Sequence, residues 1–179
     1  MNIGFDLDKI FVDYPPLIPD SLVDKLYKKK CNGTLLYRIP SWPEQILRRL
    51  SHLQILRPPI KGNVKFLKSI SKNEHKLYLI SSRFSFLKGT TNTLMKKQGF
   101  DKIFDGMYFN FQNKQPHEFK DEVLKKLNID LYVDDDFYLL KYVADKNKKT
   151  KFFWLNPQKG KRLITPNITA ISNLMDILK

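Results

Sequence analysis

Two groups of aspartates directly follow apolar stretches of this chain. Asp6 and Asp8 come after the apolar run 2–5, and the triplet 134–136 comes after the run 129–133. An Asp-x-Asp pair alone is also typical of a turn or a helix cap, but three adjacent carboxylates repel one another unless a cation lies near them. Mg²⁺ prefers such oxygen ligands. The two groups therefore predict a divalent-cation site, with three candidate ligands: Asp6, Asp134 and Asp135.

Phosphoryl transfer would use these carboxylates directly. The reaction needs a nucleophile in line with the leaving group and positive charge beside the phosphoryl oxygens. Asp6 could attack phosphorus and form an aspartyl-phosphate. Asp8 could protonate the leaving oxygen and then activate water, and we expect crowding by Asp6 to raise the pKa of Asp8. Because a phosphate dianion repels carboxylates, Mg²⁺ is the expected cofactor.

Two further segments offer a hydroxyl group and an ammonium group for the same chemistry. Ser81 follows the apolar run 76–80, and its hydroxyl could hold phosphoryl oxygens together with nearby amide groups. Lys120 lies in an expected helix before the acidic triplet and could offset the negative charge on Asp6 and the phosphate. Lys114, in a neighbouring loop, is the alternative site lysine. The candidate substrate-binding side chains are Ser82, Arg83 and Lys9.

The expected secondary structure brings these segments to one edge of a sheet. Apolar runs alternate with amphipathic stretches, which predicts an α/β fold: a doubly wound, Rossmann-like three-layer sandwich with a parallel sheet. In such a sheet, ligands bind at the carboxyl ends of the strands. The expected strands are 2–6, 76–80, 104–111, 129–133 and 151–155, and the expected helices are 61–70, 87–99, 116–127, 137–144 and 167–178.

The segment 13–56 interrupts the connection that follows the first strand. A helix is expected through Leu22 to Tyr27, and another is expected to begin at Ser41, with Glu44 completing a capping box. We therefore expect a small helical cap, and substrate selectivity would reside there. The predicted division is a HAD-like core domain of residues 1–12 and 57–179 and a cap insertion of residues 13–56.

The motifs, taken in order, resemble those of the haloacid dehalogenase-like (HAD) hydrolase superfamily. The residues 4–8, Gly-Phe-Asp-Leu-Asp, are similar to its first motif, Ser81 to its second, Lys120 to its third and Val133-Asp134-Asp135 to its fourth. The segments 57–62 and 79–83 also loosely resemble the 5′(3′)-deoxyribonucleotidase-like branch. The resemblance implies a Mg²⁺-dependent phosphoric monoester hydrolase acting on a small phosphorylated molecule, a nucleotide for this branch. It also adds the main-chain carbonyl oxygen of Asp8 to the metal ligands.

The chain departs from the family pattern directly after the first motif. The family usually has Gly-Thr or Gly-Val there, whereas this chain has Lys9-Ile10. A catalytically degenerate binding module with the same fold is therefore kept as an alternative, although the presence of both Asp6 and Asp8 favours catalysis. Receiver domains of phosphorelays use similar groups, but their acid pair comes first and their lysine last, so that class is excluded.

The composition sets weaker limits on partners and location. Lys and Arg number 32 against 18 Asp and Glu, a net charge of +14. Such a charge attracts phosphates and nucleic acids, and an enzyme or binding protein acting on nucleic-acid ends is the alternative function. Lysine runs are also typical of solvated faces. With a single cysteine, no signal sequence and no apolar run of about 18 residues, we expect a cytoplasmic protein without membrane contact; the sequence does not predict its oligomeric state.

Overall fold

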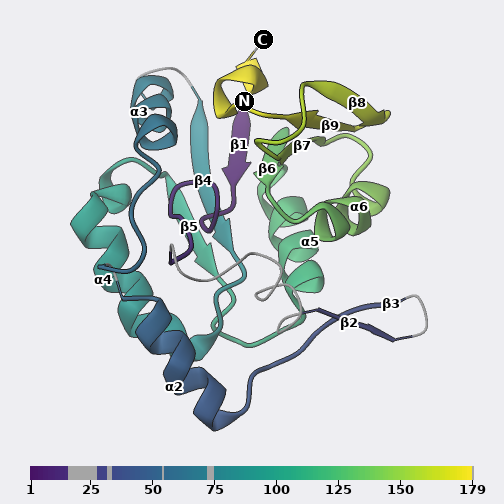
Figure 1. The fold of residues 1–179 in the computed structure, drawn as a ribbon. Helices are drawn as coiled ribbons and strands as arrows, with labels where there is room; N and C mark the ends of the chain where they lie inside the picture. Colours follow the sequence, from purple (N-terminus) through teal and green to yellow (C-terminus); the bar gives the residue numbers. More distant parts are fainter. Residues whose placement is uncertain (16–27, 32–33, 54, 72–74, 179) are drawn as a thin grey trace.

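A seven-stranded sheet forms the centre of the protein (Figure 1). The computed structural model describes residues 1–15, 28–31, 34–53, 55–71 and 75–178. The strand order is β5-β4-β1-β6-β7-β9-β8, and every neighbouring pair is parallel except β8 and β9. The strands are β1 (Asn2–Phe5), β4 (Lys76–Ser81), β5 (Gly106–Phe109), β6 (Leu131–Asp134), β7 (Lys151–Leu155), β8 (Arg162–Thr165) and β9 (Ile168–Ile171).

Helices cover both faces of the sheet, which confirms the three-layer α/β prediction. One apolar cluster joins β1 to α3 and α4, and a second joins β6 to α5 and α6. The strands in the middle of the sheet are apolar on both faces, as expected for a parallel sheet enclosed by helices. The helices are α3 (Lys61–Ile70), α4 (Lys88–Gln98), α5 (Pro116–Leu127) and α6 (Phe137–Lys146).

Gly4 of β1 leaves room for the ring of Tyr132, its partner on the neighbouring strand β6. A Cβ atom at Gly4 would lie 2.9 Å from Cδ2 of Tyr132, closer than van der Waals contact allows. The Tyr132 hydroxyl donates to Asp134 Oδ2 at 3.1 Å. A side chain at position 4 would therefore displace a ring that supports one of the candidate metal ligands.

The C-terminal segment differs from the prediction. A helix was expected over 167–178, but the chain forms β9 and then a short 3₁₀ helix, Leu174–Leu178. Three side chains of β9 are buried: Ile168, Ala170 and Ile171. β8 pairs with β9 in an antiparallel hairpin. β-branched residues suit this pleated surface, and the pairing with β7 overrides the weak helical pattern.

The described part of the segment between β1 and α3 lies beyond the carboxyl ends of the strands (Figure 1). It holds an antiparallel hairpin of β2 (Lys28–Cys31) and β3 (Thr34–Tyr37), then α2 (Trp42–Ser51). The expectation of a helical cap is therefore only partly right. The expected start of α2 is confirmed, because the Glu44 carboxylate accepts hydrogen bonds from the Ser41 amide and hydroxyl. The helix expected over Leu22 to Tyr27 lies outside the described residues.

The described helices are short. The longest, α5, has 12 residues. Within the described part of the chain, no helix combines the length and hydropathy that crossing a bilayer requires.

Candidate active site

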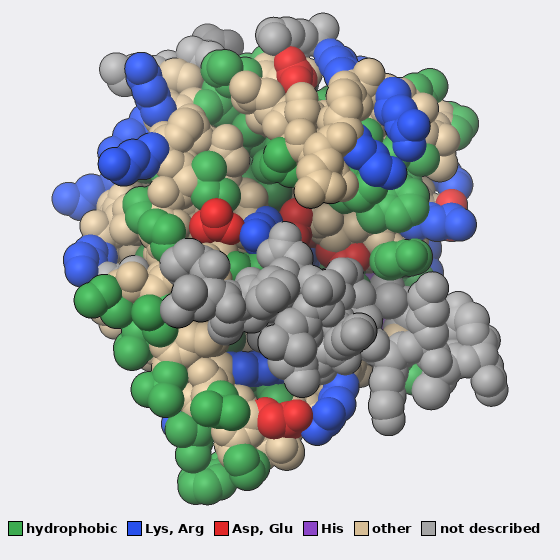
Figure 2. Space-filling model, viewed as in Figure 1, with side chains coloured by type: hydrophobic (Ala, Val, Ile, Leu, Met, Phe, Trp, Pro, Cys, Tyr) green, Lys and Arg blue, Asp and Glu red, His purple; other side chains and the backbone are tan. Residues whose placement is uncertain are grey.

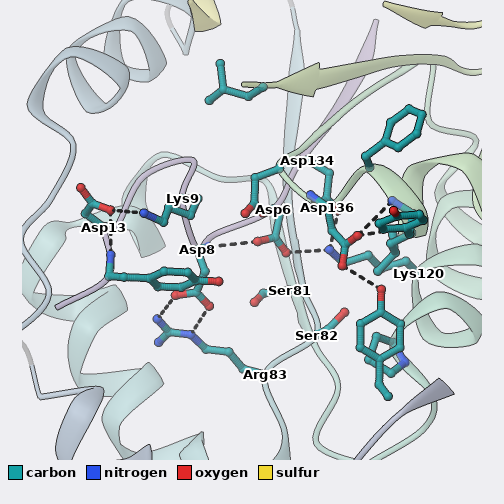
Figure 3. A pocket seen from close by; sticks show the side chains of 18 of the residues that line it. Asp6, Asp8, Lys9, Asp13, Ser81, Ser82, Arg83, Lys120, Asp134 and Asp136 are labelled. Atoms are coloured by element: carbon teal, nitrogen blue, oxygen red, sulfur yellow. Dashed lines mark hydrogen bonds and ion pairs between the residues drawn. The ribbon is translucent and has the colours of Figure 1, made fainter. Parts of the chain in front are cut away.

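The carboxyl ends of three neighbouring strands bring together the residues that the sequence singled out. β1 pairs with β4 on one side and with β6 on the other. Asp6 follows β1, Ser81 ends β4 and Asp134 ends β6. Figure 3 shows these side chains around one cavity, with Lys120 reaching them from α5. The expected convergence of distant segments is thus present.

Three carboxylates lie close enough to hold one ion. Asp6, Asp134 and Asp135 each offer an oxygen atom, and these atoms lie within 4.8 Å of one another. Asp6 and Asp134 are buried, and Asp135 is partly buried. An all-oxygen set of this kind suits Mg²⁺, so these are the candidate metal ligands.

Among the residues that the structure describes, Lys120 is the lysine that contacts this carboxylate cluster. Its Nζ donates to Asp6 Oδ1 at 2.8 Å and to Asp134 Oδ2 at 2.6 Å. Burial alone would lower the pKa of Lys120, but Asp134 and Asp6 raise it well above the ordinary value, so the side chain is charged. The alternative, Lys114, instead pairs with Glu122 at the surface.

The cluster holds more negative charge than one lysine neutralises. Burial, together with Asp134 and Asp8, raises the pKa of Asp6 to about 7, against the opposing effect of Lys120. Burial and Asp134 also raise the pKa of Asp135 well above its usual range. Carboxylates with such pKa values favour a nearby cation when ionised. The residues present therefore fit a divalent ion.

Asp8 points away from this cluster. Its carboxylate accepts hydrogen bonds from Arg83 Nε at 2.9 Å, Arg83 Nη2 at 2.7 Å and Arg57 Nη1 at 2.6 Å. Burial would raise the pKa of Asp8, but the two guanidinium groups hold it well below its usual range. The expectation of a raised pKa for Asp8 is therefore wrong, because the neighbouring arginines outweigh the effect of burial. Two guanidinium groups within 2.7 Å therefore favour the ionised form of Asp8.

The two serines lie between these charged groups (Figure 3). Ser81 is buried at the end of β4. The Ser82 hydroxyl is buried without a hydrogen-bond partner among the described residues. Both side chains line the same cavity as Asp6 and Arg83, so two hydroxyl groups are available to an oxyanion there.

Lys9 occupies a position whose backbone suits glycine. Its φ is 61°, in the left-handed region that costs a non-glycine residue about 1 kcal/mol. The Lys9 ammonium group pairs with Asp13 at 2.9 Å and lies over the Tyr14 ring. Lys9 therefore keeps the glycine-like turn after the first motif, and its side chain forms part of the cavity wall.

Sequence reasoning missed several groups that organise the site. The Tyr37 hydroxyl donates to Asp136 Oδ2 at 2.8 Å, and Asp136 also caps α6 by accepting from the amides of Tyr138 and Leu139. The third acid of the triplet is thus a helix cap and not part of the ion cluster. An aspartate just before an apolar helix was the available signal for the cap; no sequence signal pairs it with Tyr37.

The cavity lies between the carboxyl ends of the central strands and the described part of the inserted segment. Its volume is about 690 Å³. Arg48 of α2, His52 directly after this helix and Tyr37 of β3 form one wall, and Phe137 and Trp154 form an aromatic part of another. This volume lies in the range of small-molecule sites.

Solved structures share this fold. The putative β-phosphoglucomutase of Thermotoga maritima is 16% identical, with a TM-score of 0.63 over 99% of this chain and 96% of that one. A D,D-heptose 1,7-bisphosphate phosphatase of B. bronchiseptica, complexed with magnesium and phosphate, is 10% identical, with a TM-score of 0.55 over 99% and 96%. The putative HAD-hydrolase YfnB of Bacillus subtilis, bound to magnesium, is 14% identical, with a TM-score of 0.53 over 74% of this chain.

These comparisons establish the HAD-like fold. This chain spans only 58% of the length of the YfnB chain. No protein-family model matches the sequence, and no curated protein matches it. The similar structures do not single out the deoxyribonucleotidase-like branch.

Proposed function

We propose that this protein is a magnesium-dependent phosphatase that hydrolyses a phosphate monoester through an aspartyl-phosphate on Asp6. The observation that carries the proposal is the position of Asp6, whose carboxylate is shared between Lys120 and the acidic cluster at the carboxyl end of the sheet. Similar structures crystallised with magnesium and phosphate support it.

Asp6, Asp134 and Asp135 would hold the metal ion, together with the main-chain carbonyl oxygen of Asp8. Mg²⁺ bound there supplies positive charge against the phosphoryl oxygens. The donor set supports this assignment because it consists of oxygens and carries an excess of negative charge.

The chain's own groups perform the covalent steps. An Asp6 oxygen attacks phosphorus, the ester P–O bond breaks, and the leaving alkoxide takes a proton. Lys120 stabilises the negative charge on Asp6 and the phosphoryl group. Ser81 and Ser82 donate to phosphoryl oxygens. Water then attacks the phosphorus of the aspartyl-phosphate, releasing phosphate and restoring Asp6.

Both proton transfers on Asp8 require its bonds to Arg83 and Arg57 to loosen when substrate enters, because the two guanidinium groups hold its pKa well below the range of an effective acid or base. Asp8 then takes a proton from solvent and gives it to the leaving oxygen in the first half. In the second half its carboxylate takes the proton from the attacking water. Arg83 and Lys9 are the proposed contacts for the substrate's own negative charge.

The substrate class we propose to test first is a nucleotide. The aromatic wall supports it, since the rings of Phe137 and Trp154 lie 4.7 Å apart by their centroids beside the acid cluster. A base can stack on such rings. On the face in Figure 2, Lys and Arg side chains are spread over several parts rather than gathered in one track, so this face gives no support to binding of nucleic-acid ends.

Phosphate release from an aryl phosphate tests the reaction. We expect release with Mg²⁺, none with EDTA, and a loss of at least about 10³-fold in Asp6→Asn. The matched control is Asp145→Asn, a surface aspartate paired with Lys148, which should keep full activity. Full activity of Asp6→Asn would exclude this nucleophile. A panel of nucleotides and sugar phosphates then tests the substrate class, and a clear preference for sugar phosphates would exclude the nucleotide.

A further inference from the structure

Helix α2 turns polar side chains toward the protein and apolar side chains toward solvent. Arg48 and His52, one turn apart, are only 9% and 6% exposed and line the cavity. On the opposite side, Trp42 and Leu47 are 73% and 67% exposed. A helix on the surface of a globular protein normally buries its apolar stripe and exposes its polar side chains. The outward side of α2 is therefore apolar and exposed to solvent.

The apolar surface continues past the end of the helix. Figure 2 shows hydrophobic side chains gathered over α2. We define the α2 face by its exposed members: Trp42, Ile46, Leu47, Leu50, Leu53, Ile55 and Leu56. Together they expose on the order of 700 Å², close to the roughly 800 Å² that each partner contributes to a stable protein interface. Exposed apolar patches of that size mark interaction sites.

The chemistry of the α2 face favours a second copy of this chain. Its members carry no charge, so the face needs no partner of opposite charge. In a two-fold dimer the same patch meets itself, and leucine and isoleucine side chains spaced along a helix can interdigitate with their own copies.

A membrane surface fits less well. Helices that lie on anionic lipid present basic side chains beside their apolar face. The arginines of α2 are engaged elsewhere: Arg48 faces the cavity, and Arg49 Nε donates to the main-chain oxygen of Phe86 at 3.0 Å. These contacts turn both guanidinium groups toward the protein.

We propose that the α2 face is the interface of a symmetric homodimer. In the dimer, the partner subunit would pack against the exposed face of α2, while Arg48 and His52 on the other face line the cavity. This assembly does not depend on the proposed reaction, and it is tested in the absence of substrate.

Light scattering during size-exclusion chromatography, on a dilution series of the full chain, tests the assembly. We expect twice the chain mass at high concentration, and a monomer for Leu47→Glu and for Leu50→Glu. The matched control is Leu163→Glu on β8, where the leucine is 68% exposed but far along the sequence from α2; it should remain a dimer. A monomeric wild type, or a dimeric Leu47→Glu protein, overturns the proposal.

Two further measurements keep the test decisive if a glutamate variant does not fold by circular dichroism. Trp42 should become shielded in the dimer, so dilution of the wild type should shift tryptophan emission to the red, and Trp42→Phe should remove that shift. Emission that is independent of concentration contradicts the interface. Flotation with phosphatidylserine-containing vesicles should leave the protein unbound; a monomer that floats with them replaces the dimer with a membrane contact.

Discussion

Helices α5 and α2 both supply side chains to the cavity, but they are attached to the protein in opposite ways. α5 buries Phe119, Val123 and Leu124 in an apolar cluster against the sheet, and it carries Lys120 into the acidic site. α2 turns Arg48 and His52 inward and leaves its apolar side in solvent. The core thus positions Lys120 by apolar packing. The described part of the inserted segment adds the Tyr37 ring to the same apolar cluster and is joined to the site by several polar contacts.

Those polar contacts use site residues. Arg57 donates to the main-chain oxygen of Ser51 at the end of α2 and to Asp8. Tyr37 of β3 bonds Asp136, and its main chain pairs with the Gln115 side chain. Asp8 and Asp136 therefore hold the insertion, while Asp6 and Asp134 are held by Lys120. We call the contacts of Lys120 with Asp6 and Asp134 the core mode, and the contacts of Asp8 and Asp136 with the inserted segment the insertion mode. Four substitutions test the two modes, in order from the largest expected effect to the smallest.

Lys120→Met tests the core mode. Removing the ammonium group leaves two buried carboxylates without their shared cation, which costs about 3–5 kcal/mol in the free energy of unfolding. Urea denaturation in EDTA measures this loss. The control Lys125→Met removes an exposed lysine on the same helix and should change stability by about 0.5 kcal/mol or less. Equal effects of the two variants would show that Lys120 is not the central cation.

Arg57→Met tests the insertion mode. The variant removes the Arg57 hydrogen bonds to Asp8 and to the Ser51 oxygen, while Asp8 keeps its bonds to Arg83. The expected cost is about 2–3 kcal/mol in the free energy of unfolding. Hydrogen exchange should rise in α2 far more than in α5. Arg38→Met, which removes an exposed arginine paired with Glu44, is the control. Unchanged protection of α2 would contradict the role given to Arg57.

His52 should make the insertion sensitive to pH. Burial, then Arg57 and Arg83, lower the pKa of His52 to about 3 in the folded protein, while the unfolded chain binds the proton near pH 6.5. Stability is therefore complete above pH 6.5 and falls as the pH drops from 6.5 toward 3, by roughly 2 kcal/mol at pH 5. His52→Gln should flatten this part of the profile, and His75→Gln should not. An unchanged profile in His52→Gln would contradict the assignment.

Tyr37→Phe should have the smallest effect. It removes the hydroxyl that donates to Asp136, which lowers the free energy of local opening of the β2–β3 hairpin by about 1 kcal/mol, while the ring stays near His117. Faster proteolysis of the hairpin, with unchanged core stability, is the expected result. Tyr78→Phe on β4 is the control. A loss of several kcal/mol would mean that Tyr37 supports the core as well.

The sequence predicts the core better than the insertion for a physical reason. Apolar strands such as 129–133, followed at once by acids, locate both the sheet and the ends of its strands. The orientation of Asp8 depends instead on Arg57 and Arg83, which lie 49 and 75 residues away along the chain. The strand Lys28–Cys31 is mostly lysine and shows no apolar alternation, so its pairing with β3 has no local signal.

The ion site is the central claim, and calorimetric titration with Mg²⁺ tests it most directly. We predict one bound ion per wild-type chain, binding abolished in Asp134→Asn, and binding retained in the surface variant Asp145→Asn. Absence of binding in the wild type, or equal binding in Asp134→Asn, would contradict the assignment of the acidic cluster as a metal site.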